Sequence, residues 1–287
     1  MPRLKFFLLS VVILVAAFIV SSCNNSVELE TTTTTATTST QTPIKGPDRA
    51  DGQMNDNDQT FRSLTVSNIS PEVVFLGSEG NGIFRSTDGG TSWDWLRSGL
   101  LHTGTSYPEI YDIAIHPSNN DSVYAATLTG YGVSDFGGPY KSTDSGDNWA
   151  RKINGLGNNY YASSITIDPA NPSTLYLAIG AGTSTGGSDQ GTFYNGAIYK
   201  STDSGDTWSS LNVPSPTDQN RITKIIAWDS NNIYFLGTNF TDTTEAAGLM
   251  KSADAGQSWA AINTPNIHVA AFDVAPLNKN IIIISQR

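Results

Sequence analysis

The sequence has few of the features that would indicate disulfide, metal or nucleic-acid chemistry. It contains one cysteine among 287 residues, so no intramolecular disulfide can form and stability must come from apolar burial. The 16 Lys and Arg are outnumbered by 26 Asp and Glu, which argues against nucleic acid and against docking on anionic lipid. The histidines, His102, His116 and His268, lack ligand spacing, so we expect no metal and no cofactor.

Long apolar runs are also lacking, apart from one at the N-terminus. Residues 6–20 are apolar except for one serine, which is shorter than the roughly 20 residues that span a bilayer. Arg3 and Lys5 precede this run and small residues follow it, an arrangement typical of a secretory signal. No helical period of apolar residues follows residue 23, so the rest of the chain is not predicted to be helical.

The end of this segment, Val20-Ser21-Ser22-Cys23, resembles the lipobox of bacterial lipoproteins, although valine replaces the usual leucine. The resemblance implies that residues 1–22 are removed and that Cys23 is lipidated. The chain would then be an exported, membrane-anchored lipoprotein, either periplasmic or on the cell surface. The alternative is an ordinary signal peptide with an incidental cysteine.

Residues 23–60 are predicted to form a disordered tether after the lipidated cysteine. Threonine dominates residues 31–42, and the stretch up to residue 59 is rich in polar and turn-forming residues. With so few apolar residues, burial cannot offset the entropy cost of ordering this segment. The membrane would therefore be contacted through the lipid alone, and the folded body is predicted to occupy residues 61–287.

Internal repetition is the strongest signal in that body. Four segments share the pattern S-x-D-x-G-x-x-W, and their tryptophans are 56, 59 and 51 residues apart. The shared aspartates, glycines and tryptophans are Asp88, Gly90 and Trp93; Asp144, Gly146 and Trp149; Asp203, Gly205 and Trp208; Asp254, Gly256 and Trp259.

These segments resemble the Asp box, or bacterial neuraminidase repeat, over residues 63–287. The family includes sialidases, sortilin-type receptors, xyloglucanases and photosystem assembly factors, and the resemblance implies a β-propeller. The residue types suit a hairpin turn, because Asp accepts bonds from amides two residues on and Gly supplies a positive φ. A calcium loop is the alternative, but the alternating carboxylates and final Glu are missing. We therefore predict a structural role for all four boxes.

Each box ends a longer unit of short β-rich runs and turn residues, which reads as four strands. The predicted blades cover residues 63–97, 110–153, 163–211 and 222–262, and a fifth begins at residue 269 and stops after its second strand. The predicted fold is thus an all-β propeller of four complete four-stranded blades plus half of a fifth, incomplete at the C-terminus.

The blade topology predicts which loops carry function. The Pro/Asn turns and the boxes should share one face, and the longer, more variable loops should lie on the opposite one. Aromatic and acidic side chains in those loops suit a carbohydrate, although such aromatics can also simply pack on neighbouring loops. These loops hold Tyr107 and Glu109, the predicted ligand-binding residues Tyr131, Asp135, Phe136, Phe193 and Tyr194, and a second acid, Asp189.

Two enzyme classes can be compared with the sequence. Sialidases need three arginines, and the first lies in an F-R-x-P motif that residues 61–64 match without the proline. Xyloglucanases carry a catalytic aspartate in D-x-G-G-x-Y, which residues 135–140 match, but they take the second carboxylate from a second propeller that this sequence lacks. We therefore predict a binding or scaffolding module for a glycan or protein ligand. The alternative is a xyloglucanase-like glycoside hydrolase that uses Asp135 and Asp189.

Overall fold

The computed structural model describes residues 60–102, 107–128, 136–157, 160–180, 182–183, 193–213, 220–239, 248–263 and 269–286. The chain divides into two units, Met1–Thr42 and Pro43–Arg287, and every described residue belongs to the second. The predicted signal, Cys23 and the tether lie outside the described residues, so their assignments stay predictions.

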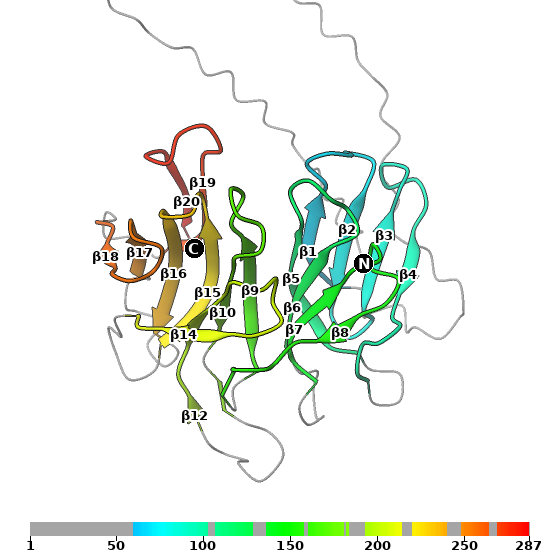
Figure 1. The fold of residues 1–287 in the computed structure, drawn as a ribbon, viewed down its shortest axis with the longest axis horizontal. Coiled ribbons are helices and arrows are strands. Elements are labelled where there is room, and N and C mark those ends of the chain that lie inside the picture. The colour runs from blue at the N-terminus through cyan, green and yellow to red at the C-terminus, as the bar shows by residue number, and fades with distance from the viewer. Residues whose placement is uncertain are drawn as a thin grey trace, which may run out of the picture. The chain divides into compact units, whose positions relative to one another are not determined.

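The described residues form antiparallel four-stranded sheets that follow one another along the chain, which confirms the predicted propeller (Figure 1). Blade 1 contains β1 (Phe61–Val66), β2 (Val74–Ser78), β3 (Ile83–Ser86) and β4 (Asp94–Leu96). Blade 2 contains β5 (Glu109–Ile115), β6 (Val123–Leu128), β7 (Gly138–Ser142) and β8 (Ala150–Arg151). Blade 3 contains β9 (Ala162–Ile167), β10 (Leu175–Ile179), β13 (Ala197–Ser201) and β14 (Ser209–Leu211).

Blade 4 contains β15 (Asn220–Ala227), β16 (Ile233–Asn239), β17 (Gly248–Ser252) and β18 (Ala260–Ala261). The half-blade consists of β19 (Val269–Val274) and β20 (Ile282–Gln286), as predicted. A small hairpin of β11 (Gly182–Thr183) and β12 (Phe193–Tyr194) lies between the second and third strands of blade 3. Sequence patterns did not predict this hairpin.

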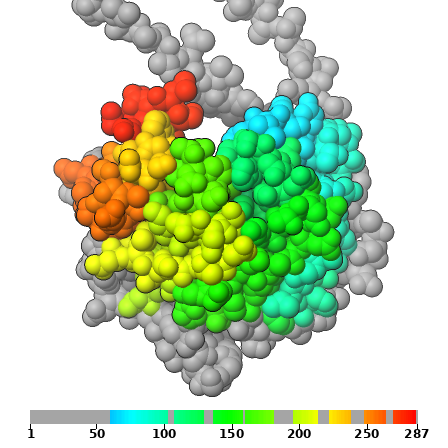
Figure 2. Space-filling model, viewed as in Figure 1, coloured from blue at the N-terminus to red at the C-terminus, as the bar shows by residue number. Residues whose placement is uncertain are grey.

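The first strands of successive blades, β1, β5, β9, β15 and β19, contact one another in turn, so we call them the inner strands. The apolar core is divided into four clusters, and each one fills the boundary between two neighbouring blades. The space-filling view shows the surfaces of successive blades in direct contact (Figure 2). The fold is therefore stabilised by the packing of each blade against its neighbours. This packing buries apolar side chains that a single twisted sheet would leave exposed.

The repeated tryptophans belong to these boundaries. Trp149 and Trp208 are each only 4% exposed and lie in the clusters between blades 1 and 2 and between blades 2 and 3. Trp259 packs against the cluster between blades 3 and 4. Trp93, in contrast, is only partly buried and joins none of the four described clusters, because no described blade precedes blade 1.

The turns that contain the repeat, called the repeat turns below, share one hydrogen-bond pattern. In the third turn the Gly205 amide donates to Ser201 Oγ at 2.8 Å, and the Thr207 amide donates to Asp203 Oδ1 at 2.9 Å. The aspartate thus accepts an amide four residues on, rather than two as the sequence suggested, because the turn winds further before the fourth strand. Left-handed φ angles fall on Ser204 (59°) and Gly205 (82°), not on the aspartate.

This pattern lowers the pKa of the turn aspartates. The hydroxyls of residues four positions on, followed by the backbone amides there, hold the pKa of Asp88, Asp203 and Asp254 at about 2. In the second turn the Asn148 side chain does the same to Asp144, whose pKa is also lowered. All four carboxylates accept these bonds as anions, which favours the charged form.

The repeat turns and the turns between first and second strands lie on one face, which we call the turn face. In each blade an amide of the repeat turn donates to a carbonyl of the other turn, as in Ser145 to Asp121 at 2.9 Å and Ser204 to Ser173 at 2.9 Å. The remaining two kinds of connection must therefore emerge on the opposite face, which we call the loop face.

Ion pairs also join blades at equivalent repeat positions. Arg85 of blade 1 donates to Asp147 in the repeat turn of blade 2 at 2.8 Å. Lys141 of blade 2 contacts Asp206, at the same position in the repeat turn of blade 3, at 3.4 Å. In blade 4 that position holds Gln257, which cannot pair ionically with Lys200.

Candidate functional site

Most of the predicted site residues, or their side chains, lie outside the described residues. Tyr131, Asp135 and Asp189 lie outside the described residues. Phe193 and Tyr194 form β12, whose backbone pairs with β11, but their side chains also lie outside the description. Phe136 is half-buried, and its carbonyl accepts the Tyr140 hydroxyl at 2.8 Å. Their proposed grouping therefore stays a prediction.

The inner strands share an irregularity near their loop-face ends that the sequence did not reveal. Each loses register with its neighbour at one residue, which is a β-bulge. A bulge re-aims the side chain of the unpaired residue and is common next to functional sites. The unpaired residues are Arg62, Tyr111, Ser163, Thr223 and Ala270.

In the first two blades, the bulges help assemble a charged cluster. The Arg62 guanidinium lies 4.9 Å from the Tyr111 ring centroid, so the two bulged residues contact each other across the blade boundary. Arg62 Nη2 is 2.7 Å from Glu79 Oε2, and Arg62 Nε is 3.5 Å from Glu109 Oε2. We call Arg62, Glu79, Glu109 and Tyr111 the loop-face carboxyl cluster.

The two carboxylates of this cluster occupy different environments. The Glu109 side chain is 9% exposed, whereas that of Glu79 is 30% exposed. Burial, and then the charge of Glu79, raise the pKa of Glu109, against the opposing effects of Arg62 and Tyr111. Burial of a carboxyl group beside a second carboxylate is one of the ways in which enzyme sites raise the pKa of an acid.

A repeat position connects this cluster to the predicted site. Gly82, directly before β3, and Gly138, the first residue of β7, occupy equivalent repeat positions, and both have positive φ angles, 87° and 119°. Glu79 lies three residues before the first and Asp135 three residues before the second. Aligning the blades on these glycines would have identified Glu79 from the sequence, and Glu109 was already present among the predicted loop acids.

Aromatic side chains also gather on the loop-face side of blade 1, where they pack on one another and on Arg97. Trp95 stacks on Phe84 at 5.6 Å, and the Arg97 guanidinium lies 2.8 Å from the Trp95 ring centroid. Arg97 also lies 4.7 Å from the Tyr107 centroid, and Tyr107 stacks on His102 at 4.9 Å. For Tyr107 the packing alternative therefore holds, because its ring contacts both Arg97 and His102.

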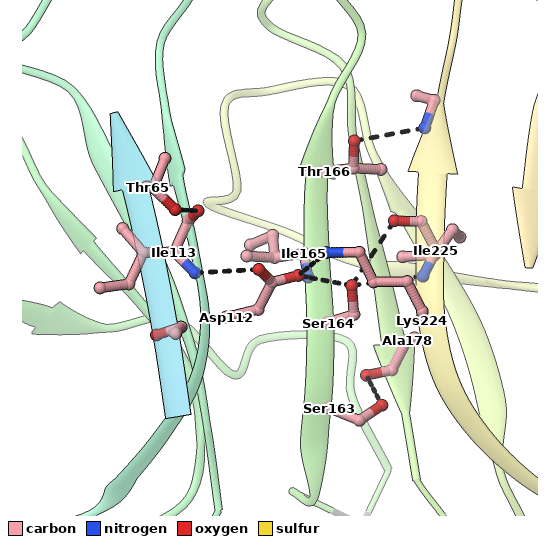
Figure 3. Close-up of polar contacts among 12 residues, drawn as sticks. Thr65, Asp112, Ile113, Ser163, Ser164, Ile165, Thr166, Ala178, Lys224 and Ile225 are labelled. Atoms are coloured by element: carbon pink, nitrogen blue, oxygen red, sulfur yellow. Dashed lines mark hydrogen bonds and ion pairs between the residues drawn. The ribbon is translucent and has the colours of Figure 1, made fainter. Parts of the chain in front are cut away.

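Beyond the bulges, the inner strands are joined by a polar cluster that we call the inner clasp. Asp112, Ser164 and Lys224 occupy the same repeat position in blades 2, 3 and 4 and point toward one another (Figure 3). Asp112 Oδ2 accepts the Ser164 hydroxyl at 2.5 Å, the Ile165 amide at 3.2 Å and Lys224 Nζ at 3.1 Å. Lys224 thus reaches across an entire inner strand, so the clasp links three blades.

Ser164 is fully buried, which makes the clasp a positioning element rather than a site for a ligand. Its hydroxyl also accepts the Ile225 amide at 3.2 Å, so every member has a defined partner. Within the part of the chain that the structure describes, no group of three or more His, Cys, Asp and Glu could hold a metal ion. The same residues contain no helix long and apolar enough to cross a membrane.

Comparison with known proteins finds relatives that are named xyloglucanases. A xyloglucanase of Paenibacillus sp is 27% identical over 175 residues, which is 57% of this chain and 15% of that enzyme. A xyloglucanase of Hypocrea jecorina is 27% identical over 164 residues, covering 53% and 17% of the two chains. The chain therefore spans under a fifth of the length of the curated relatives it matches.

A solved xyloglucanase from Xanthomonas campestris superposes with a TM-score of 0.55 at 20% identity, over 79% of this chain and 35% of that one. This likeness supports the propeller fold. The Sortilin-Vps10 family, described as sortilin, neurotensin receptor 3, matches residues 137–287, which is more than half of the sequence. These residues include three of the four repeat turns and the half-blade, and on this match the chain belongs to the Sortilin-Vps10 family.

Proposed function

We propose that this protein is an exported propeller of the glycoside-hydrolase type that acts on a xyloglucan-like polysaccharide at its loop face. The observation that carries the proposal is the alignment of more than half of the chain with proteins named xyloglucanases. The loop-face carboxyl cluster adds support, because it presents two carboxyl groups on that face and cleavage of a glycosidic bond uses two.

The proposal includes the N-terminal assignments. Cleavage after residue 22 and lipidation of Cys23 would attach the propeller to a membrane through a polar tether, where it could meet an extracellular polymer. We propose that the repeat turns are Asp boxes with a structural role, because their aspartate carboxylates accept hydrogen bonds from groups within the same turn.

If the protein is a hydrolase, we propose that Asp135 supplies one catalytic carboxylate and Asp189 the other. Asp135 lies in the D-x-G-G-x-Y segment, and Asp189 lies in the corresponding connection of the next blade. Hydrolysis needs the two groups about 5–10 Å apart on either side of the scissile bond. Tyr131 and Phe193 would supply stacking surfaces for the sugar rings.

A second function, binding without turnover, is favoured by the family description, which names a receptor. In that case the same face would hold a glycan or a protein ligand. The two functions share a binding surface. They differ in whether carboxylates on that surface cleave the bound glycan.

One experiment separates the two. The full chain, solubilised in detergent, is incubated with xyloglucan, and both reducing ends and retardation in xyloglucan-containing gels are measured. A hydrolase gives new reducing ends that Asp135→Asn abolishes, while Asp273→Asn, an exposed aspartate on β19, leaves them unchanged. Retardation without reducing ends would establish binding alone, and Tyr131→Ala with Phe193→Ala should weaken it. Absence of both signals would refute the proposed function.

A further inference from the structure

We propose that copies of this chain associate head to tail, with the half-blade of one copy packed on blade 1 of the next. The contact would repeat, between two copies, the boundary that joins successive blades within one copy. Such an association does not depend on the proposed function. In each blade we call the face toward the preceding blade the backward face, and the face toward the following blade the forward face.

The backward face of blade 1 exposes apolar residues that every later blade buries. Leu64 is 65% exposed, whereas the four residues at its repeat position are at most 6% exposed. Val66 and Phe61, on the same strand, are also exposed. The strand registers give the four equivalents of Leu64 as Ile113, Ile165, Ile225 and Phe272, and each belongs to a different boundary cluster. Blade 1 therefore presents a boundary face that no described blade covers.

The forward face of the half-blade is exposed in the same way. Ile283 is 57% exposed, whereas the residues at its repeat position in the four complete blades are at most 2% exposed. These equivalents are the aromatic residues Phe75, Tyr124, Tyr176 and Tyr234. Ile281, just before β20, is exposed as well. The half-blade thus presents the opposite kind of boundary face, again without a described blade against it.

The two exposed faces are the matching halves of one boundary. Within the chain, the residue at the Ile283 position of one blade shares a cluster with the residue at the Leu64 position of the next blade. Phe75 and Ile113 are such a pair in the first boundary, and the other three boundaries repeat it. A further boundary of this kind would bring Ile283 of one copy against Leu64 of the next copy, and would remove both side chains from water.

The turns between first and second strands give a second, independent observation. Ile69 in blade 1 and Leu277 in the half-blade are exposed, and each lies three residues after the last paired residue of its inner strand. The turns of blades 2 and 3 have the same length and carry Ser118 and Ala170 at this position. The repeat itself therefore does not require a large apolar side chain there, yet both turns that would approach each other in the proposed contact have one.

Turns of this kind do meet at the boundaries within the chain. Ser67 Oγ of the blade 1 turn donates to Asn120 Oδ1 of the blade 2 turn at 2.6 Å. Trp228 Nε1 of the blade 4 turn likewise donates to the Ala275 carbonyl of the half-blade turn at 2.9 Å. A contact between copies that follows the same geometry would bring the two apolar turns together as well as the two strand faces.

A second copy suits these faces better than the rest of this chain does. Residues 24–59 are mostly polar, so they offer few apolar side chains for either face. Blade 1 and the half-blade lie at opposite ends of the row of described blades (Figure 1), and a head-to-tail contact uses one face from each. The same contact, repeated between copies, therefore covers both faces.

The test is cross-linking of the full chain in native membranes. Cys23 is the one cysteine of the sequence, so an introduced thiol is a defined reactive group, and the wild type shows any background from Cys23. Leu64→Cys and Ile283→Cys are expressed together and treated with a bismaleimide of about 10 Å, the separation of packed sheets. The mixture should give a cross-linked dimer, whereas either variant alone should give only background. The control mixture replaces Leu64→Cys by Leu101→Cys, an exposed leucine on the loop face, and should also give only background.

Charge substitutions provide a second readout, the co-isolation of two differently tagged copies. Leu64→Lys or Ile283→Asp would place an unpaired charge in the contact and should lower co-isolation at least about tenfold. Both substitutions in one chain should restore it, because the ammonium group of one copy then meets the carboxylate of the next. Leu101→Lys should have no effect. If Leu64→Lys lowers the melting temperature, Leu277→Lys replaces it, since Leu277 is almost fully exposed.

Three outcomes would overturn the proposal. Equal cross-linking by each single variant would mean that a face contacts its own counterpart, which a head-to-tail contact excludes. Protection of the thiol at position 64 from a water-soluble maleimide, without a dimer, would mean that lipid or another protein covers the face. A reactive thiol at both positions and no dimer above the Leu101→Cys control would mean that both faces stay open to water.

Discussion

The inner clasp makes a quantitative prediction about stability. Replacing Asp112 by alanine removes the side-chain acceptor of the Ile165 amide and the closer acceptor of the fully buried Ser164 hydroxyl, which keeps only a long contact of 3.5 Å to the Ile225 carbonyl. Leaving a buried donor without a partner costs about 1–3 kcal/mol, so Asp112→Ala should lower the free energy of unfolding by roughly 2–4 kcal/mol. The loss should be measured by urea unfolding followed by tryptophan fluorescence.

Replacing Lys224 by methionine should behave differently. Its side chain is 41% exposed, and its ion pair with Asp112 is screened by water. Pairs of this kind contribute about 0–1 kcal/mol, and the remaining donors to Asp112 are unaffected by the change. The predicted asymmetry is therefore a large effect at Asp112 and a small one at Lys224, although both belong to the same ion pair.

A double-mutant cycle tests the reasoning. The coupling between Asp112→Ala and Lys224→Met should stay below about 1 kcal/mol, and 1 M salt should reduce it. Asp273→Ala, at an exposed aspartate of another inner strand, is the matched control and should change stability by less than about 0.5 kcal/mol. If Lys224→Met destabilised the protein as much as Asp112→Ala, the explanation by lost buried acceptors would be wrong.

Four further predictions concern the repeat and the N-terminus. Trp208→Ala should cost about 3–5 kcal/mol in urea unfolding, and Trp93→Ala clearly less, because only Trp208 is buried between two described blades; equal losses would contradict this. The turn aspartates with a pKa of about 2 stabilise the folded state above their unfolded pKa of 3.8, so stability should decline as pH falls from about 4 toward 2, as an acid titration of the melting temperature would show. Gln257→Asp should give Lys200 the partner that Lys141 has one blade earlier and raise stability by up to about 1 kcal/mol in low salt, an increase that high salt should remove. Cys23→Ser should abolish incorporation of radiolabelled fatty acid and membrane partitioning, and retention of both would exclude lipidation at this residue.

The repeat made most of the fold predictable. Turn residues must occupy a tight hairpin, and the spacing of the tryptophans leaves room for four short strands, so the number of blades follows from the sequence. The predicted end of blade 3, residue 211, is the end of β14, whereas blade 2 was predicted to reach residue 153 and its fourth strand, β8, contains only Ala150–Arg151. Strand ends depend on where neighbouring backbones separate, and no side-chain pattern encodes that point.

The candidate site was less predictable, because its members are distant in sequence. Glu79 lies 17 residues from Arg62 and Glu109 lies 47, and their contact depends on the bulge in β1. A bulge leaves no mark in an alternating pattern of polar and apolar residues as short as that of residues 61–66. The acid at Glu109 was recognised as a loop residue, but the burial that raises its pKa became visible only in the packed structure.

The partition of the core into one cluster per boundary has a consequence for how the protein unfolds. Each blade depends mainly on its immediate neighbours, so the chain resembles a linear array with nearest-neighbour coupling more than a single cooperative globule. The resistance of a blade to opening should therefore depend mainly on the two boundaries that it shares with its neighbours. The inner clasp, which links blades 2, 3 and 4, should then make these the last blades to exchange their amide hydrogens.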